Sequence, residues 1–155
     1  MIEKKFHVSA IGNAMLDVVC EVTDEFLVKE NILKGNMQLI SQDRSKYLLT
    51  IITPVKETAG GSAANTISTL SKLGLKTAYI GKVSDDKEGG LFRNDLNIQS
   101  ITYKTQTLPP ESSLTTGKCI VMVTSDKERT MNTYLGATEL LEKEDIDLEI
   151  IEKSE

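Results

Sequence analysis

The sequence of 155 residues contains little of what several classes of protein require. It has no tryptophan, one histidine and two cysteines. A single histidine excludes a histidine-rich metal site and the HExxH motif of zinc proteases. Cys20 and Cys119 are far apart and do not follow the spacing of metal ligands. Two such thiols are typical of a reducing cytoplasm rather than of a disulfide-stabilised scaffold.

Long apolar runs and clusters of basic residues are also missing. No segment approaches the roughly 18 consecutive apolar residues of a membrane-spanning helix. The first residues, MIEKKFHVSAIG, lack the apolar centre of a signal peptide. The net charge is -5, and the basic residues are scattered singly or in pairs, which disfavours binding to nucleic acid. We therefore expect a cytoplasmic protein that has neither nucleic acid nor a membrane as its partner.

Strand-like and helix-like segments alternate along the chain. The clearest helix follows a double glycine, with Ala63, Ile67, Leu70 and Leu73 on one apolar face and Gly74 at its end. Alternation of this kind predicts an α/β fold with a mainly parallel sheet, in one domain. The expected strands are 6–11, 18–22, 77–83, 98–105 and 119–123, and the other expected helices are 42–52, 85–96 and 139–152.

The stretch AGGSAANTISTLSKLG, residues 59–74, admits two interpretations. One is a glycine turn that lets a helix pack closely against a sheet. The other is a ligand site, because Gly60 and Gly61 leave their amides accessible and either can adopt a positive φ. Ser62 is then expected to cap the helix, and Asn65 offers a donor and an acceptor from its first turn. Such a set suits a polyol, which needs both kinds of hydrogen-bond partner.

Two common phosphate-binding motifs are absent. The ten glycines include no GxG pair, so the dinucleotide fingerprint is missing. Gly81-Lys82 and Gly117-Lys118 lack the upstream glycine of a Walker A loop and are followed by Val83 and Cys119. The double glycine is therefore better explained by a neutral ligand or by packing.

A second polar group occurs near the N-terminus, in IGNAMLD, residues 11–17. Asn13 and Asp17 are expected just beyond the carboxyl end of the first strand, which is where open α/β sheets bind their ligands. An ionised aspartate there can accept two strong hydrogen bonds from hydroxyl groups. The alternative is that Asp17 only caps a turn.

Four segments together resemble the PfkB-type carbohydrate kinases, which include ribokinase and adenosine kinase. They are IGNAMLD, AGGSAANTISTLSKLG, TAYIGKVSDDKEGGLFRNDL and TTGKCIVMVTSDKERTMNTYLGA, and they look most like the adenosine kinase branch. The resemblance implies a ribokinase-like, doubly wound α/β sheet with a small β-sheet lid. Residues 1–155 would be the N-terminal portion of that single domain, with lid strands from about 18–40 and 100–123.

The resemblance also implies ATP-dependent, Mg²⁺-dependent phosphorylation of a sugar or nucleoside hydroxyl, with an adenosine-like substrate favoured. By motif match Asp17 would hold the ribose hydroxyls. Gly60, Gly61 and Asn65 would complete the sugar site, and Asn13 would lie beside it. Ser62 and Arg129 are possible accessory residues.

The sequence departs from the family in length, because family members are about twice as long. A second signature of the DTxGAGD type, with the catalytic aspartate, is absent, so no catalytic residue and no metal ligand is expected in this chain. Three interpretations follow: a kinase half that another chain or a continuation completes, a non-catalytic fragment of a truncated kinase gene, or a stable nucleoside- or sugar-binding module. Self-association through the lid or an exposed sheet edge is a further expectation.

Overall fold

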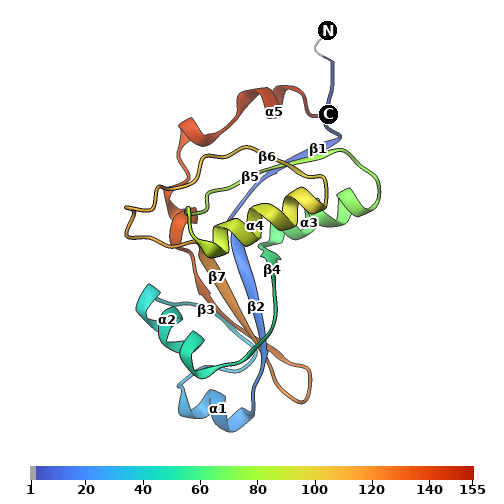
Figure 1. Ribbon diagram of the computed structural model, residues 1–155. Coiled ribbons are helices and arrows are strands. Elements are labelled where there is room, and N and C mark those ends of the chain that lie inside the picture. Colours follow the sequence, from blue (N-terminus) through green and yellow to red (C-terminus); the bar gives the residue numbers. More distant parts are fainter. Residues whose placement is uncertain (1–2) are drawn as a thin grey trace.

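The computed structural model describes residues 3–155, which form a three-stranded and a five-stranded β-sheet (Figure 1). The strands are β1 (Val8–Ile11), β2 (Met15–Glu21), β3 (Met37–Leu39), β4 (Pro54–Gly60), β5 (Thr77–Ile80), β6 (Thr102–Tyr103), β7 (Gly117–Val123) and β8 (Arg129–Tyr134). The helices are α1 (Asp24–Lys29), α2 (Gln42–Ile51), α3 (Ser62–Lys72), α4 (Lys87–Ile98) and α5 (Leu148–Glu152), with short 3₁₀ segments η1 (Gly136–Leu140) and η2 (Lys143–Asp145).

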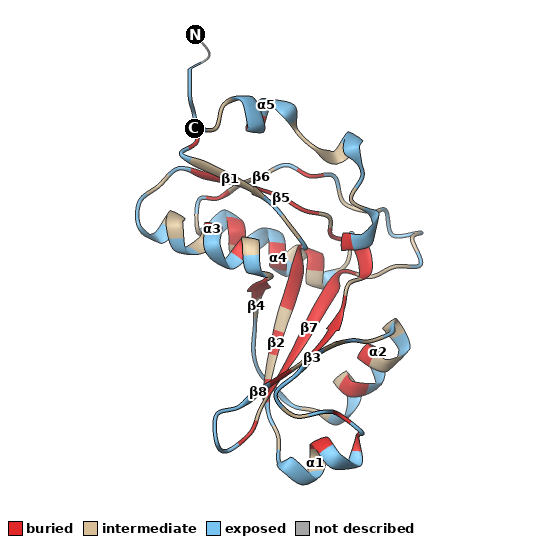
Figure 2. Ribbon diagram, turned by 180° about the vertical axis from the view of Figure 1, so that it is seen from behind, coloured by how far each residue is buried: buried red, intermediate tan, exposed pale blue. Residues whose placement is uncertain are grey.

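The three-stranded sheet is parallel, in the order β1-β5-β6, and lies between two layers. Helices α3 and α4 cover one face (Figure 2), where the core residues include Ala64, Ile67, Tyr79, Phe92 and Leu96. The C-terminal segment with α5 covers the other face, through Phe6, Ala78, Ile80 and Ile150. The strand residues therefore alternate between two buried surfaces, as expected for a strand covered on both sides.

The five-stranded sheet is mixed, in the order β3-β8-β7-β2-β4. Strand β2 runs parallel to β7 and antiparallel to β4, whereas β7 and β8 are antiparallel. Helices α1 and α2 cover one face through Cys20, Leu27, Leu48, Ile120 and Met122. Within residues 3–155 no helix packs on the opposite face, which presents a smaller cluster of Met15, Cys119 and Val121. This uncovered face forms the floor of the candidate site.

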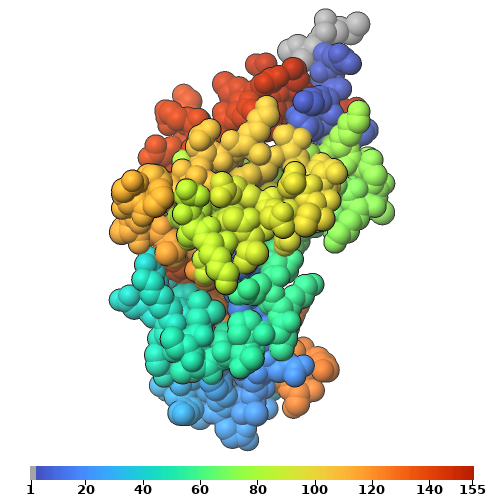
Figure 3. Space-filling model, in the orientation of Figure 1, coloured from blue at the N-terminus to red at the C-terminus, as the bar shows by residue number. Residues whose placement is uncertain are grey.

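The chain passes between the two sheets at three places and leaves the larger sheet for the C-terminal segment at a fourth, and a glycine lies at or next to each of these crossings. The crossings lie at Gly12, Gly61, Gly117 and Gly136. Gly61 and Gly136 have positive φ values of 97° and 57°, which disfavour residues with a side chain. A Cβ at Gly136 would lie 2.3 Å from the carbonyl oxygen of Thr115. The molecule is elongated, with α1 at one end and the C-terminal segment at the other (Figure 3).

Several sequence-based expectations for the elements are wrong. The parallel arrangement holds for the smaller sheet alone, because the larger one is mixed. Only two residues of the strand expected at 98–105 form a strand, since α4 continues to Ile98 and Ser100 follows with a φ of 58°. The helix expected at 139–152 is broken, because Asp145 and Asp147 accept hydrogen bonds from nearby backbone N–H groups.

The expectations for α3 need two corrections. Gly61, not Ser62, is the N-cap residue, and no side chain caps this helix. The reason is that β4 extends to Gly60, and the positive φ of Gly61 makes the turn into the helix. Leu73 is 74% exposed and does not belong to the apolar face, because the helix ends at Lys72. Gly74, with a φ of 87°, follows the helix end as expected.

Candidate functional site

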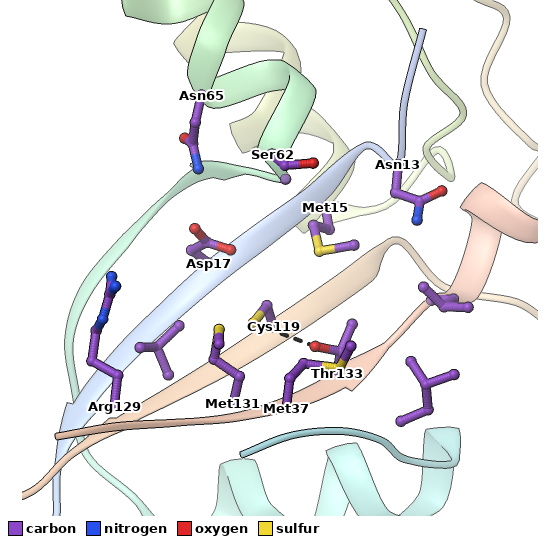
Figure 4. Close-up of a pocket in the computed structure, with 14 residues that line it drawn as sticks. Asn13, Met15, Asp17, Met37, Ser62, Asn65, Cys119, Arg129, Met131 and Thr133 are labelled. Carbon is purple, nitrogen blue, oxygen red and sulfur yellow. Dashed lines mark hydrogen bonds between the residues drawn. The ribbon is translucent and has the colours of Figure 1, made fainter. Parts of the chain in front are cut away.

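A cavity of about 620 Å³ lies on the uncovered face of the five-stranded sheet, next to the N-terminus of α3 (Figure 4). Its volume is within the range of small-molecule sites. The residues that line it come from both sheets and from α3: Asn13, Met15, Asp17, Met37, Leu39, Gly61, Ser62, Asn65, Cys119, Val121, Arg129, Met131, Thr133 and Leu135.

The floor of the cavity consists of alternate residues on adjacent strands. Asp17 pairs with Cys119, and Cys119 pairs with Thr133, so these three form a row across β2, β7 and β8. The Thr133 hydroxyl donates a hydrogen bond of 3.5 Å to the Cys119 sulfur. The neighbouring positions on the same face are Met15, Val121 and Met131. Because side chains two residues apart share a face of a strand, this mainly apolar, sulfur-rich floor follows from the register.

The polar groups gather along one side of this floor. Asn65 and Ser62 project from the first turn of α3, Asp17 points up from β2 beneath Asn65, and Arg129 lies at the end opposite Asn13 (Figure 4). The Thr133–Cys119 contact is the hydrogen bond drawn among the lining residues. None of the ion pairs found in residues 3–155 includes Asp17 or Arg129. These side chains are therefore available to a ligand.

Burial determines the electrostatics of the floor. It raises the pKa of the Asp17 carboxyl above its usual value, because the surroundings disfavour the charged form. The pKa of the Cys119 thiol is raised by burial and by the nearby Asp17 charge, while the hydrogen bond from Thr133 acts in the opposite direction. A ligand whose hydroxyl groups donate to Asp17 would stabilise the carboxylate and lower its pKa.

Comparison with known proteins shows the family to which the chain belongs. A profile of the pfkB family carbohydrate kinases matches residues 33–155. The chain belongs to the PfkB family. The family assignment and the ribokinase-like fold suggested by the sequence motifs are thereby confirmed.

Solved structures of PfkB-type kinases superpose closely on the chain. The adenosine kinase from Sinorhizobium meliloti is 39% identical, with a TM-score of 0.89, and the match covers 97% of this chain and 45% of that enzyme. A probable sugar kinase from Rhizobium etli is 36% identical, with a TM-score of 0.88 and the same coverage. Adenosine kinase 2 of Arabidopsis thaliana is 28% identical over 136 residues, which are 82% of this chain and 37% of the relative. The chain thus spans less than half the length of these relatives.

The structure brings together six of the seven residues that the sequence singled out. Asn13, Asp17, Gly61, Ser62, Asn65 and Arg129 all line the cavity. Asp17, however, is not beyond a strand end, as expected, but inside β2. The reason is that the chain leaves β1 at Gly12 and enters a second sheet within three residues.

Gly60 lies next to the cavity but does not line it. A Cβ at this position would lie 2.2 Å from Cγ of Asp17, so the aspartate side chain occupies the space that Gly60 leaves. A Cβ at Gly61 would lie 2.3 Å from the carbonyl oxygen of Asn13. The packing of the protein itself therefore requires both glycines. The roles of the seven residues in substrate binding remain predictions.

The sequence-based reasoning missed the floor of the cavity. Residues 119–123 were expected to form a buried strand, and β7 confirms it, but Cys119 and Val121 face the cavity while Ile120 and Met122 face the core. The available signal was the alternation in RTMNTYL, where Arg129, Met131, Thr133 and Leu135 all line the cavity. Among residues 3–155 no group of three or more His, Cys, Asp or Glu residues is arranged to hold a metal. None of the helices described is long and apolar enough to cross a membrane.

Proposed function

We propose that this chain forms the substrate-binding half of an ATP-dependent nucleoside kinase of the PfkB family, with an adenosine-like substrate. One observation carries the proposal: a single unpaired carboxylate, Asp17, lies beside Asn65 at the edge of an otherwise apolar floor. The ribose hydroxyl groups would donate to Asp17 and exchange hydrogen bonds with Asn65. The planar base would lie on the floor formed by Met15, Cys119 and Met131.

The character of the floor favours a nucleoside over a free sugar. A hexose carries hydroxyl groups around its whole ring, and those facing the methionines would lose their water without gaining a partner, at about 1–3 kcal/mol each. A purine instead buries its apolar face against thioether groups, which adapt well to flat ligands. The similarity to an adenosine kinase, at 39% identity, agrees with this choice.

The chain binds and orients its substrate in this proposal and does not transfer the phosphoryl group. Phosphoryl transfer depends on positioning and on charge stabilisation, and loss of the general base alone removes about 10²–10⁴ in rate. We found no glycine-rich second signature in the sequence and no metal-binding cluster in residues 3–155. The residues present therefore do not fit ATP and Mg²⁺, and we assign neither to this chain.

Calorimetric titration of the chain with adenosine, ribose and fructose tests the proposal. We expect saturable binding of adenosine, binding of ribose at least tenfold weaker, and loss of adenosine binding in Asp17→Ala. Equal affinity for ribose and adenosine would contradict the placement of the base on the floor. Adenosine binding that survives in Asp17→Ala would show that the sugar site is misplaced. Formation of AMP from adenosine and ATP by the chain alone would contradict the half-site.

A stable nucleoside-binding module without any chemistry is the second candidate. The availability of Asp17, Asn65 and Arg129 for a ligand supports it equally. The two candidates differ in whether adding a polypeptide equivalent to the part of the Sinorhizobium meliloti enzyme outside the match yields AMP from adenosine and ATP, which a coupled assay measures.

A further inference from the structure

The row of cavity residues that begins at Asp17 continues onto β3, the outermost strand of the five-stranded sheet. Leu39 of β3 pairs with Thr133, and Met37 pairs with Met131, in parallel register. Both β3 side chains line the cavity. We call these two residues, Met37 and Leu39, the outer floor, because they lie one strand beyond the part of the floor on which the base is placed.

The residue between them shows which way β3 is turned. The side-chain amide of Gln38 donates a hydrogen bond to the side-chain oxygen of the buried Asn132. Asn132 in turn contacts the sulfur of Met122, which belongs to the core beneath α1 and α2. Because alternate residues of a strand point to opposite faces, Met37 and Leu39 share the cavity face.

The outer floor differs from the rest of the floor in its exposure. Met37 is 57% exposed and Leu39 is 63% exposed, whereas Thr133 and Cys119 on the next two strands are each 6% exposed. The floor is therefore buried at β7 and β8 and open at β3. Large apolar side chains that line a cavity and remain in contact with water are typical of a surface that an apolar group covers.

The spacing of the strands sets how far a nucleoside reaches along the row. Neighbouring strands lie about 4.8 Å apart, so Thr133 is roughly 10 Å from Asp17, and Leu39 is one spacing further. A purine nucleoside whose ribose hydroxyls bind Asp17 reaches Thr133 with the edge of the base that carries the exocyclic amine, and it leaves the outer floor uncovered. The cavity of about 620 Å³ is large enough for a drug-sized ligand and so has room for more than a nucleoside.

We propose that the outer floor binds an apolar substituent on the exocyclic amine of the base, so that the site prefers alkylated adenosines to adenosine. This assignment rests on the proposed function, which places the ribose at Asp17. An alkylated amine keeps one N–H, and the Thr133 hydroxyl oxygen can accept it because its own proton is donated to the Cys119 sulfur. Strand β3, with the sequence MQL, contains no charged residue, so the substituent buries no charge there.

A small contact is enough for a measurable preference. A tenfold gain in affinity, about 1.4 kcal/mol, corresponds to roughly 55 Å² of apolar surface removed from water. A cyclopentyl ring placed against two side chains that are each more than half exposed supplies an area of this size. A methyl group on the same amine ends short of β3 and does not.

Calorimetric titration of the chain tests the assignment, with adenosine and two derivatives that carry a methyl or a cyclopentyl group on the exocyclic amine. We expect cyclopentyladenosine to bind about tenfold more tightly than adenosine, and methyladenosine to bind within about threefold of adenosine. Leu39→Thr should abolish the preference and leave the affinity for adenosine within about twofold, since threonine is compatible with a strand. The matched control Val55→Thr, on the other outer strand of the sheet and also 63% exposed, should retain the preference.

The methyl signals of the methionines locate the substituent independently. The signal of Met37 should shift when cyclopentyladenosine is added and stay in place when adenosine is added. The signals of Met15 and Met131, which lie under the base, should shift with both ligands. Equal shifts of Met37 with the two ligands would place the base itself on the outer floor and overturn the assignment.

Three calorimetric results would also overturn it: equal affinity for adenosine and cyclopentyladenosine, a preference that survives in Leu39→Thr, or equal effects of Leu39→Thr and Val55→Thr. A dimer of the chain that Leu39→Thr dissociates would do the same, because a second copy would then cover the outer floor.

Failure of the proposed function is visible separately. Adenosine binding without any preference would retain the function and reject this assignment alone. Binding of cyclopentyladenosine that depends on Leu39 but survives in Asp17→Ala would retain the apolar contact and reject the placement of the ribose. No binding of any of the three nucleosides by the folded chain would reject both.

Discussion

The carboxylate of Asp17 occupies the space that a side chain at residue 60 would need. A Cβ built on Gly60 would lie 2.2 Å from Oδ1 and 2.5 Å from Oδ2 of that aspartate. The two residues lie on adjacent antiparallel strands, β2 and β4, whose register places Thr58 opposite Asp17. The double glycine and the aspartate, 43 residues apart in the sequence, therefore form one structural unit at the edge of the cavity.

Gly60→Ala should displace the Asp17 side chain. We expect a loss of about 1–3 kcal/mol in the free energy of unfolding, typical of overpacking, and at least a tenfold loss of adenosine affinity. Gly90→Ala is the matched control, because a Cβ at Gly90, within α4, would meet no atom within 4 Å. It should stabilise the chain by about 0.5–1 kcal/mol. Urea unfolding measures the change in stability, and calorimetry measures the affinity for adenosine. Unchanged affinity in Gly60→Ala would contradict the dependence of the Asp17 position on Gly60.

Asp17→Asn separates binding from folding. Hydrogen bonds to a charged group are worth about 1.5–3 kcal/mol, so the variant should bind adenosine at least tenfold more weakly. Because the folded state raises the pKa of Asp17, it binds this proton more tightly than the unfolded chain does. The parent therefore loses stability as the pH rises from the unfolded pKa to the folded pKa, and asparagine removes this loss.

The stability difference between Asp17→Asn and the parent should thus favour the variant increasingly as the pH rises. Urea unfolding from about pH 4 to about pH 8 measures it. A difference that is constant with pH would show that folding leaves this pKa unchanged, and one that increasingly favours the parent as the pH rises would show that the folded chain stabilises the carboxylate.

Asp95→Ala should loosen the end of β4. In the parent, the Asp95 carboxylate on α4 accepts hydrogen bonds from the Ala59 N–H at 2.7 Å and the Thr58 hydroxyl at 3.1 Å. Without this carboxylate the Ala59 N–H and the Thr58 hydroxyl both lack an acceptor. This should cost about 1–3 kcal/mol of stability and increase amide exchange at residues 58–61. Asp95→Asn keeps an acceptor and should recover part of the loss. If the two variants were equally destabilised, the interaction would depend on charge instead of on an available acceptor.

Met131→Thr tests the apolar floor. Met131 is half-buried and lines the cavity on β8, and threonine is compatible with a strand. Removing its contact with the base should weaken adenosine binding by about tenfold, or about 1.4 kcal/mol, and leave ribose binding unchanged. Val55→Thr, outside the cavity, serves as the control. Equal losses for ribose and adenosine would indicate that the base lies elsewhere.

Both thiols should be unreactive in the folded chain. Cys20 and Cys119 are buried, and burial raises the pKa of Cys20 to about 11. At pH 8 roughly one Cys20 thiol in a thousand is then ionised. Labelling with a chromogenic disulfide reagent should proceed only at the rate of unfolding, and adenosine should slow it at Cys119. Immediate labelling of one equivalent under native conditions would contradict this burial.

The sequence was sufficient for the elements whose signals are local. The apolar positions Ala63, Ile67 and Leu70 together with Gly74 predict α3, and the continuous apolar run after Gly117 predicts β7. The motifs around Asp17 and Gly60 were sufficient to recognise the family. Helix and strand propensity and short motifs act over a few residues, so they can be read without knowing which segments meet in space.

Tertiary structure decided where these elements lie relative to one another. The chain changes sheet at Gly12, Gly61 and Gly117. Only the register of β2 with β7 and of β7 with β8 brings Asp17, Cys119 and Thr133 into one row. The continuous run of β7 did not reveal which residues face a cavity, because both of its faces are largely buried. Its two surfaces differ because α1 and α2 pack on one of them, whereas the other lines the cavity.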